Sequence, residues 1–404
     1  MNIRRLMLLA SLGVFFVVDF VSAQTWIQQT NSPAQEWTCI ASSADGSRIA
    51  AASSDGPIYT SFDSGITWAE ATNAPGSLWI AVVSSADGIK LAALNIGGSF
   101  NSDDSIIYSS ADSGATWTNI YTPSVYLNCM ASSADGTTLI AGDWNDFGGP
   151  SMIYSSTNSG ITWVTNNAPS EYWTSMASSA DGTKFVAGCV NPDDTGTVFV
   201  SPDSGMTWNA TDLPFAYWQA VASSADGSKL VAAASGGSVY TSTNSGASWR
   251  TSNIPVTFWS SVASSADGTK FMAVNTYGLL NDAGVIYTSS DSGSSWLSND
   301  VPNNVSWQAI AASADGNRLA LATFNNSIYA FYATPHPELN LKPLASHLTL
   351  SWIVPATPFV LQQSADWISW TNVTEAPTLN LTNLRNEISV SPSNSIGLYR
   401  LMTP

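Results

Sequence analysis

A unit of about 45 residues recurs seven times along the chain, and this repetition limits what the chain can fold into. The clearest copy, Trp218 to Trp249, holds short apolar segments separated by turns at Ala225-Asp226-Gly227 and Asn244-Ser245-Gly246. Asp-Gly is a strong hairpin signal, because Gly tolerates a positive φ. The first-turn aspartates recur at separations of 42, 48, 46, 45, 41 and 48 residues, as Asp45, Asp87, Asp135, Asp181, Asp226, Asp267 and Asp315.

Seven units of four short antiparallel strands predict an all-β fold, a seven-bladed β-propeller. One such sheet cannot bury both of its faces, whereas seven packed in a ring can, and the ring leaves only short outer edges. The seventh unit lacks a fourth strand after Ser327 to Tyr332, while Thr25-Trp26 matches the Thr67-Trp68 that ends blade 1. We therefore expect residues 24–31 to supply the outer strand of the last blade.

The segments outside the repeats divide the rest of the chain. Residues 1–23 have Arg4-Arg5 before an apolar run, then small residues up to Ala23, as a signal peptide does. We expect cleavage after Ala23 and a secreted or cell-envelope exterior location.

The propeller is expected to fill residues 24–334, with a proline-containing linker at 335–338. Alternating segments in residues 339–404 predict a small β-sandwich-like C-terminal domain.

Charge restricts the partners. The net charge is −17, with only 12 Lys and Arg in 404 residues. This balance argues against nucleic acid or an anionic membrane surface, and it favours cations, neutral glycans or basic protein surfaces. After cleavage we expect no membrane insertion, and we expect a monomer.

The cysteines are interpreted as buried thiols. There are three, and Cys39 and Cys129 occupy the same repeat position, where the other units have Ala or Ser. A small buried slot explains this pattern better than a disulfide framework does.

The third strand and its turn carry a motif in six copies, for example IYTSFDSGITW at 58–68 and IYSSADSGATW at 107–117. This motif resembles the Asp-box, or BNR, repeat. The resemblance implies the propeller found in sialidases, some xyloglucan-cleaving glycosidases, sortilin-type receptors and photosystem assembly factors of the Ycf48 kind. That range includes enzymes, receptors and scaffolds, so the fold does not select a function. The C-terminal residues SADWISWTNV and LYRL resemble a domain that recurs behind unrelated secreted bacterial proteins, which assigns no activity.

The acid of the box is interpreted as structural. Asn replaces Asp in two of the copies, and it keeps the acceptor for the turn amides but loses the charge. This suits a turn cap and not a catalytic acid. The six positions are Asp63, Asp112, Asn158, Asp203, Asn244 and Asp291.

Length variation is confined to one connection in each repeat. From the first-turn Asp to the third-strand aromatic there are 14 residues in blades 1, 5 and 7, but 21, 19, 18 and 20 in blades 2, 3, 4 and 6. The connection between the second and third strands lies on the same face as the blade-to-blade crossings, which we call the insertion face. Both Asp turns lie on the opposite face, the turn face. Repeat proteins usually place insertions on their binding face.

The inserted connections are acidic and aromatic. Aromatic rings stack on sugar faces and carboxylates accept hydroxyl protons, so these residues are ligand-binding candidates, although acidic surface loops can also be merely solvated. The candidates are Asp103, Asp104, Asp143, Trp144, Asp146, Phe147, Asp193, Asp194 and Tyr277. The aromatics that open the blades either join this surface or fill the wedge between blades. They are Trp37, Trp79, Trp173, Trp218, Trp259 and Trp307, with Leu127 in blade 3.

Three function classes remain, and we favour the first: an exported non-catalytic binding propeller for a glycan or a protein. A glycoside hydrolase would need two spaced carboxylates, for which Asp143 or Asp146 could pair with Asp194 or Asp282. An assembly or scaffold protein is the third class. A calcium ion at the loops of blades 2 to 4 is the one cofactor considered, although no loop has EF-hand spacing.

Two kinds of chemistry are excluded from the propeller. The sialidase family clamps a sugar carboxylate with three arginines, but the repeat accounts for every Lys and Arg of the propeller except Arg250. Both histidines, His336 and His347, lie beyond the repeats, which removes histidine-based catalysis and zinc ligation there.

Overall fold

The computed structural model describes residues 25–402, with gaps at 77, 97–104, 121–125, 145–150, 192, 194, 277–283, 300, 302–304, 325–326, 334–338, 344–346, 355–358, 365–367 and 391–397. Within these ranges the regular structure is entirely β-strand. The described part of the chain therefore contains no helix of the length and hydropathy needed to cross a membrane.

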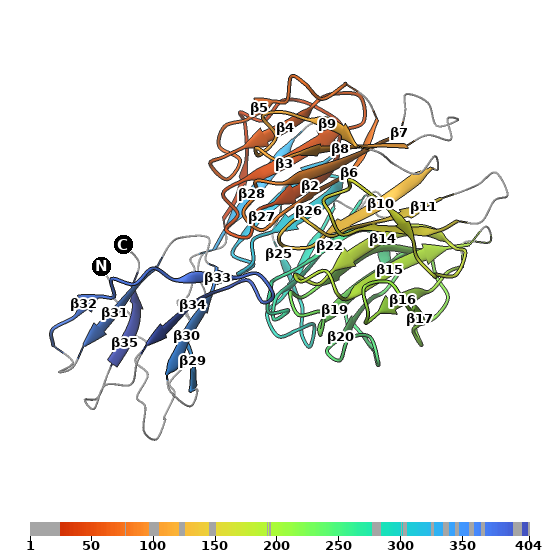
Figure 1. Ribbon diagram of the computed structural model, residues 1–404. Helices are drawn as coiled ribbons and strands as arrows, with labels where there is room; N and C mark the ends of the chain where they lie inside the picture. The colour runs from red at the N-terminus through yellow and green to blue at the C-terminus, as the bar shows by residue number, and fades with distance from the viewer. Residues whose placement is uncertain are drawn as a thin grey trace.

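Seven antiparallel four-stranded blades surround a central axis, which confirms the seven-bladed propeller (Figure 1). Blades 5 and 6 are joined into one continuous sheet, because Ser235 and Gly237 of blade 5 pair with Phe258 and Thr257 of blade 6. Each blade runs from an inner to an outer strand. Blades 1 to 4 are β2 (Trp37–Ser42), β3 (Ile49–Ser53), β4 (Ile58–Ser61) and β5 (Ala69–Glu70); β6 (Trp79–Ser84), β7 (Leu91–Ile96), β8 (Ser105–Ser110) and β9 (Thr118–Ile120); β10 (Leu127–Ser132), β11 (Leu139–Asp143), β12 (Ile153–Ser156) and β13 (Val164–Thr165); β14 (Tyr172–Ser178), β15 (Phe185–Val190), β16 (Val198–Ser201) and β17 (Asn209–Ala210).

Blades 5 to 7 follow the same order. They are β18 (Trp218–Ser223), β19 (Leu230–Gly237), β20 (Val239–Ser242) and β21 (Arg250–Thr251); β22 (Thr257–Ser264), β23 (Phe271–Asn275), β24 (Ile286–Ser289) and β25 (Leu297–Asn299); β26 (Trp307–Ala312), β27 (Arg318–Thr323), β28 (Ile328–Tyr332) and β1 (Thr25–Gln28). The outer strand of blade 7 is thus β1, from the start of the described chain, and Trp26 pairs with Phe331 in this ladder.

The two turns of blades 1 to 6 meet on one face. In six blades the left-handed Ser of the box turn donates its amide to the first turn, as Ser64 does to the Ser47 carbonyl at 2.8 Å. In the box of blade 2, Asp112 accepts the Thr116 amide at 2.8 Å and the Thr116 hydroxyl at 2.5 Å. These two hydrogen bonds from Thr116 hold the pKa of Asp112 below its usual value. In blade 3, Asn158 accepts the Thr162 amide at 2.9 Å in the same way, but its Nδ2 donates to the Thr162 hydroxyl at 2.9 Å, so the box needs an acceptor for this amide and not a charge.

A closed circle of backbone hydrogen bonds joins the seven blades on the turn face. The Ala before each first-turn Asp donates its amide to the carbonyl of the corresponding Ala in the next blade, at 2.6–2.8 Å, and the last, Ala314, donates to the first, Ala44. We call this set the alanine ring. It consists of Ala44, Ala86, Ala134, Ala180, Ala225, Ala266 and Ala314.

The opening tryptophans fill the space between blades. All six are at most 1% exposed, and each meets the third-strand aromatic of its own blade at 5.2–5.9 Å between ring centroids. Trp79, for example, meets Tyr108 edge-on and packs among Ala52 and Ile58 of blade 1. Of the two interpretations left open above, the structure supports the wedge, and these rings are not available to a ligand.

The C-terminal domain follows the propeller as a separate β-sandwich-like module, which projects to one side (Figure 1, blue). One sheet has the order β29 (Asn340–Pro343), β30 (Leu348–Ile353), β34 (Arg385–Val390) and β33 (Thr378–Asn380); the other has β32 (Thr371–Asn372), β31 (Val360–Ser364) and β35 (Leu398–Met402). Leu350, Trp352, Leu361, Ile388 and Leu401 form its core.

Candidate binding site on the insertion face

Aromatic residues stand at or just before the insertion-face start of the inner strands in blades 3 to 6. They precede the opening residue of each blade, and the partly exposed members are Tyr126, Tyr172, Tyr217 and Phe258. A backbone hydrogen bond of 2.8 Å from the Trp144 amide to the Tyr126 carbonyl brings Trp144 to the same place.

Trp144 and Tyr172 form a stacked pair between blades 3 and 4. Their ring centroids are 5.5 Å apart and their planes differ by 5°. Both side chains are half-buried, so the stack is held in place and yet reaches solvent. Trp144 is a residue that the sequence indicated, whereas Tyr172 is the first residue of β14 and was not among the candidates.

Asp143, beside Trp144, is fully buried at the end of β11. Its Oδ1 accepts the Met152 amide at 3.0 Å, which holds together the two ends of the inserted connection of blade 3. Asn275 and Thr323 occupy the same repeat position and do the same in blades 6 and 7, by accepting the amides of Val285 and Ser327. Asp143 therefore braces a loop and presents no surface to a ligand.

Asp143→Asn is expected to stabilise the protein above neutral pH. Burial raises the pKa of Asp143 to about 6, against the opposing hydrogen bonds from Ser151 and the Met152 amide. The pKa of this carboxyl is higher in the folded than in the unfolded protein, so the free energy of unfolding falls as pH rises from about 4 to above 6. A difference of two pKa units corresponds to a loss of about 3 kcal/mol. Asn keeps the acceptor and does not ionise, so the variant should lack this pH-dependent loss. Urea unfolding of both proteins from pH 4 to 8 measures this loss. An equal dependence of the unfolding free energy on pH in the two proteins would contradict a raised pKa for Asp143.

Two other described carboxyl groups belong to the loops of blade 4. Asp193 is exposed but accepts the Thr195 hydroxyl at 2.5 Å and the Thr195 amide at 3.2 Å, and these bonds lower its pKa. Glu171 precedes Tyr172, and partial burial raises its pKa. Glu171 was not predicted, because it lies in a crossing of ordinary length and not in an insertion.

The other candidates fall outside the described residues. These are the ligand-binding candidates Asp103, Asp104, Asp146, Phe147, Asp194 and Tyr277, together with Asp282 from the proposed hydrolase pair. Of the named candidates, the structure thus places Asp143 and Trp144 side by side in blade 3, and Asp193 in blade 4.

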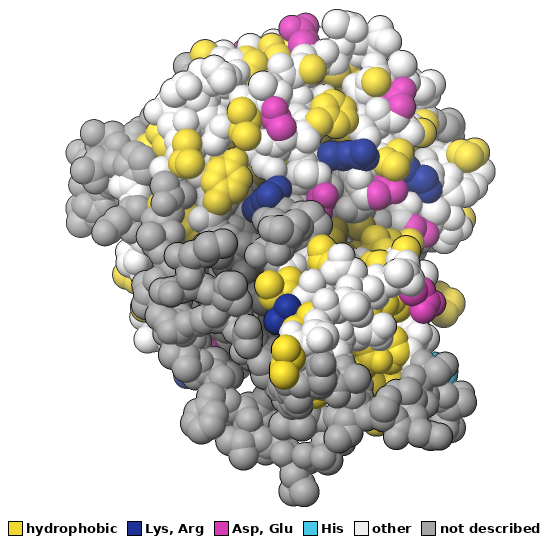
Figure 2. Space-filling model, turned by 90° about the vertical axis from the view of Figure 1, so that its left-hand side faces the viewer, with side chains coloured by type: hydrophobic (Ala, Val, Ile, Leu, Met, Phe, Trp, Pro, Cys, Tyr) yellow, Lys and Arg dark blue, Asp and Glu magenta, His cyan; other side chains and the backbone are white. Residues whose placement is uncertain are grey.

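The basic residues of the repeat are engaged on the turn face. Arg48 donates to the Asp87 carbonyl at 2.9 Å, Lys184 to the Asp226 carbonyl at 2.7 Å, and Lys270 to the Asp315 carbonyl at 2.8 Å, each across to the next blade. Figure 2 shows Lys and Arg side chains lying singly among Asp and Glu on the side that carries the C-terminal module. These cations act as links between blades and not as a carboxylate clamp.

The described cysteines are all buried free thiols, in agreement with the sequence analysis. Burial raises the pKa of Cys39 and Cys129 to about 12. In the ranges that the structure describes, no three His, Cys, Asp or Glu side chains gather in a way that could hold a metal ion.

Comparisons with known proteins agree on the fold. No protein-family model matches the sequence, and no curated protein matches it. Among solved structures, the GH74 xyloglucanase from Xanthomonas campestris is similar with a TM-score of 0.59 at 15% identity, over 81% of this chain and 59% of that chain. YCF48 from Cyanidioschyzon merolae is similar with a TM-score of 0.55 at 14% identity, over 76% of this chain and 98% of that one.

Two further solved structures extend this set. U3-55K has a TM-score of 0.59 at 15% identity, over 76% of this chain and 98% of that one. YCF48 bound to D1 peptide has a TM-score of 0.54 at 15% identity, over 79% of this chain and 99% of that one. The class that the fold defines is a β-propeller protein. The chain spans about three-fifths of the length of the xyloglucanase, and identities this low establish the fold alone.

Proposed function

We propose that the protein is an exported, non-catalytic binding propeller that engages its ligand on the insertion face. The observation that carries the proposal is the Trp144–Tyr172 stack, two parallel rings held by two blades and partly exposed beside the inserted connections. Flat aromatic surfaces with a few polar groups around them are typical of ligand sites.

A neutral glycan is the ligand class that this surface fits best. A sugar ring offers an apolar face to an aromatic stack, and its hydroxyl groups can be met by the acidic residues of the neighbouring connections. A net charge of −17 disfavours polyanions. A protein segment is the second candidate, since one solved structure of similar fold is YCF48 with a bound peptide.

Hydrolysis is the weaker alternative for the described residues. A glycosidase needs one carboxyl group to donate a proton and a second to act as nucleophile or base. Asp143 is buried and braces a loop, and the Asp193 carboxylate is bonded within its own loop. Neither carboxyl group is therefore placed to act as the acid, or as the nucleophile or base, of a glycosidase.

Trp144→Ala is expected to keep the fold and to weaken ligand retention by tenfold or more, because truncating a central aromatic costs about 2 kcal/mol of binding. Retention is measured on paired polysaccharide and peptide arrays, with reducing ends assayed in the same wells. Trp370→Ala is the matched control, because Trp370 is a partly exposed Trp of the C-terminal module. Equal retention by both variants would remove the stack from the site, and released reducing ends would favour the hydrolase.

Export is part of the proposal and rests on residues 1–23, with their basic start, apolar run and small residues before Ala23. The expected mature chain begins at Gln24, which the intact mass of the protein from an exporting host would show. A chain retaining residues 1–23 would contradict it.

A further inference from the structure

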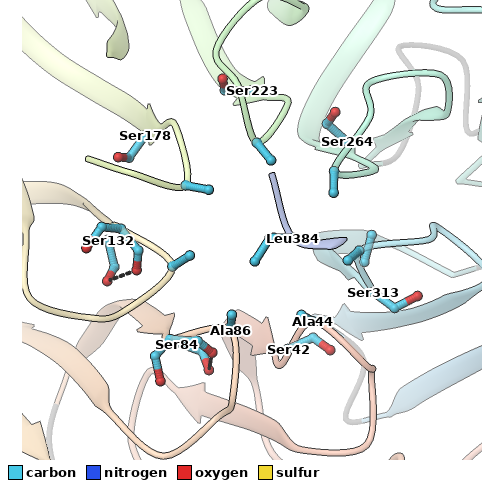
Figure 3. A pocket seen from close by; sticks show the side chains of 18 residues that line it. Ser42, Ala44, Ser84, Ala86, Ser132, Ser178, Ser223, Ser264, Ser313 and Leu384 are labelled. Atoms are coloured by element: carbon cyan, nitrogen blue, oxygen red, sulfur yellow. Dashed lines mark hydrogen bonds between the residues drawn. The ribbon is translucent and has the colours of Figure 1, made fainter. Parts of the chain in front are cut away.

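The turn-face end of the axial channel is occupied by a side chain of the C-terminal module. Leu384 lies at the centre of the alanine ring, with Ala44 and Ala86 pointing toward it (Figure 3). Ile353 and Val354, also from the module, pack against the same ring. A cavity of about 170 Å³ at this end is lined by the ring, by serines of the inner strands and by Leu384.

The backbone of Leu384 is unusual in this chain. Its φ is +52°, and the other described non-glycine residues with positive φ are the six box serines. A branched apolar side chain is disfavoured in the left-handed region, because its Cβ crowds the following carbonyl. The Leu384 carbonyl accepts the Val354 amide at 3.1 Å, which ties this turn to the end of β30. The tight turn presents the Leu384 side chain at the tip of the module.

The side-chain pattern of β30 also marks an interface. Leu350 and Trp352 are buried in the core of the module, and Thr349 and Ser351 alternate with them on the other side of the strand. Ile353 continues the Thr349 and Ser351 side, but it is apolar. The change from polar to apolar occurs where the strand reaches the alanine ring.

We propose that the C-terminal module is the stopper of the propeller: its apolar tip of Ile353, Val354 and Leu384 binds the alanine ring of the same chain and closes the channel at the turn face. The ring is a site for one branched aliphatic side chain presented on a left-handed turn. The module is then fixed on the propeller instead of being tethered through residues 335–338, and the channel opens only toward the insertion face. This role is separate from the ligand site proposed above.

Leu384→Gly tests the stopper, because Gly adopts the positive φ more readily than Leu and leaves only the side chain missing. The expected result is a folded protein whose module is released, seen in small-angle X-ray scattering as a larger radius of gyration and maximum dimension than the unaltered chain gives. Ile353→Ser, which restores the polar alternation of β30, should shift both values in the same direction. Leu381→Gly is the matched control, since Leu381 lies in the same turn, is 39% exposed and is not part of the apolar cluster that Ile353, Val354 and Leu384 form with the ring.

Three outcomes would overturn the proposal. One is an unaltered chain that already scatters as two freely moving domains. Another is unchanged dimensions for Leu384→Gly while its circular dichroism shows intact folding. The third is a dimer in light scattering that Leu384→Gly converts to a monomer, because the ring would then receive the module of a second copy.

Discussion

Deleting residues 24–31 is expected to remove most of the stability of the propeller. β1 is the outer strand of blade 7, and the Trp26 ring lies 4.7 Å from Phe331 and 6.5 Å from Trp307 between centroids. Trp26 is partly buried, and truncating a fully buried aromatic costs about 3–5 kcal/mol, against a total of about 5–15 kcal/mol for a typical domain. The deletion also exposes the edge of β28 and leaves the ends of the ring joined only by blade-to-blade contacts.

Thermal and urea unfolding of the shortened protein measure this effect. Trp26→Ala is the companion variant, since it separates the loss of the Trp26 indole side chain from the loss of the whole β1 strand. A synthetic peptide of residues 24–31 should restore part of the stability by pairing with β28. A melting temperature equal to that of the unaltered protein would show that β1 does not close the ring.

Trp79→Ala is expected to destabilise the protein by about 3–5 kcal/mol, the range for removing a large buried aromatic. Trp79 is fully buried between blades 1 and 2, meets Tyr108 at 5.5 Å, and donates its indole N–H to the Gly56 carbonyl at 3.1 Å. The substitution would leave a cavity between two sheets and an unpaired carbonyl in blade 1.

The sequence offers its own control for this position. Blade 3 has Leu127 where the other blades have Trp, and Leu127 is also fully buried. Trp79→Leu should therefore cost clearly less than Trp79→Ala in urea unfolding. A loss below about 1 kcal/mol for Trp79→Ala would mean that neighbouring blades can collapse onto the vacated space.

The propeller was predictable because its determinants are local and are repeated. Asp226-Gly227 specifies a hairpin without reference to the rest of the chain, and seven copies at a steady period specify the ring. The box could be interpreted as a cap because Asn158 replaces its acid, and in the structure Asn158 accepts the Thr162 amide as Asp112 accepts the Thr116 amide.

The candidate site was harder to predict because it depends on contacts between blades. Trp144 was indicated by an insertion, but its partner Tyr172 lies at the start of β14, outside any insertion, and meets it only when blades 3 and 4 pack. Asp143 looked like an exposed acid in an inserted loop, and only the strand register shows that it shares its position with Asn275 and Thr323.

Some of the missed contacts did leave a signal in the sequence. Ala precedes the first-turn Asp in all seven units, although turn chemistry does not require Ala there. Ile353 likewise breaks the alternation of its strand. Each of these residues proved to face another part of the fold.

The circle of alanine amides and carbonyls has a consequence for how such a protein can change in size. An open solenoid can gain or lose a terminal repeat and still keep its internal contacts. Here each amide points to the following carbonyl and the seventh returns to the first, so no blade is terminal. Any series cut short would expose one donor and one acceptor, however many blades it retained. The number of blades is therefore fixed by the whole closed circle of hydrogen bonds. A protein that gains or loses one blade must close a circle of a different size before all of these bonds are formed again.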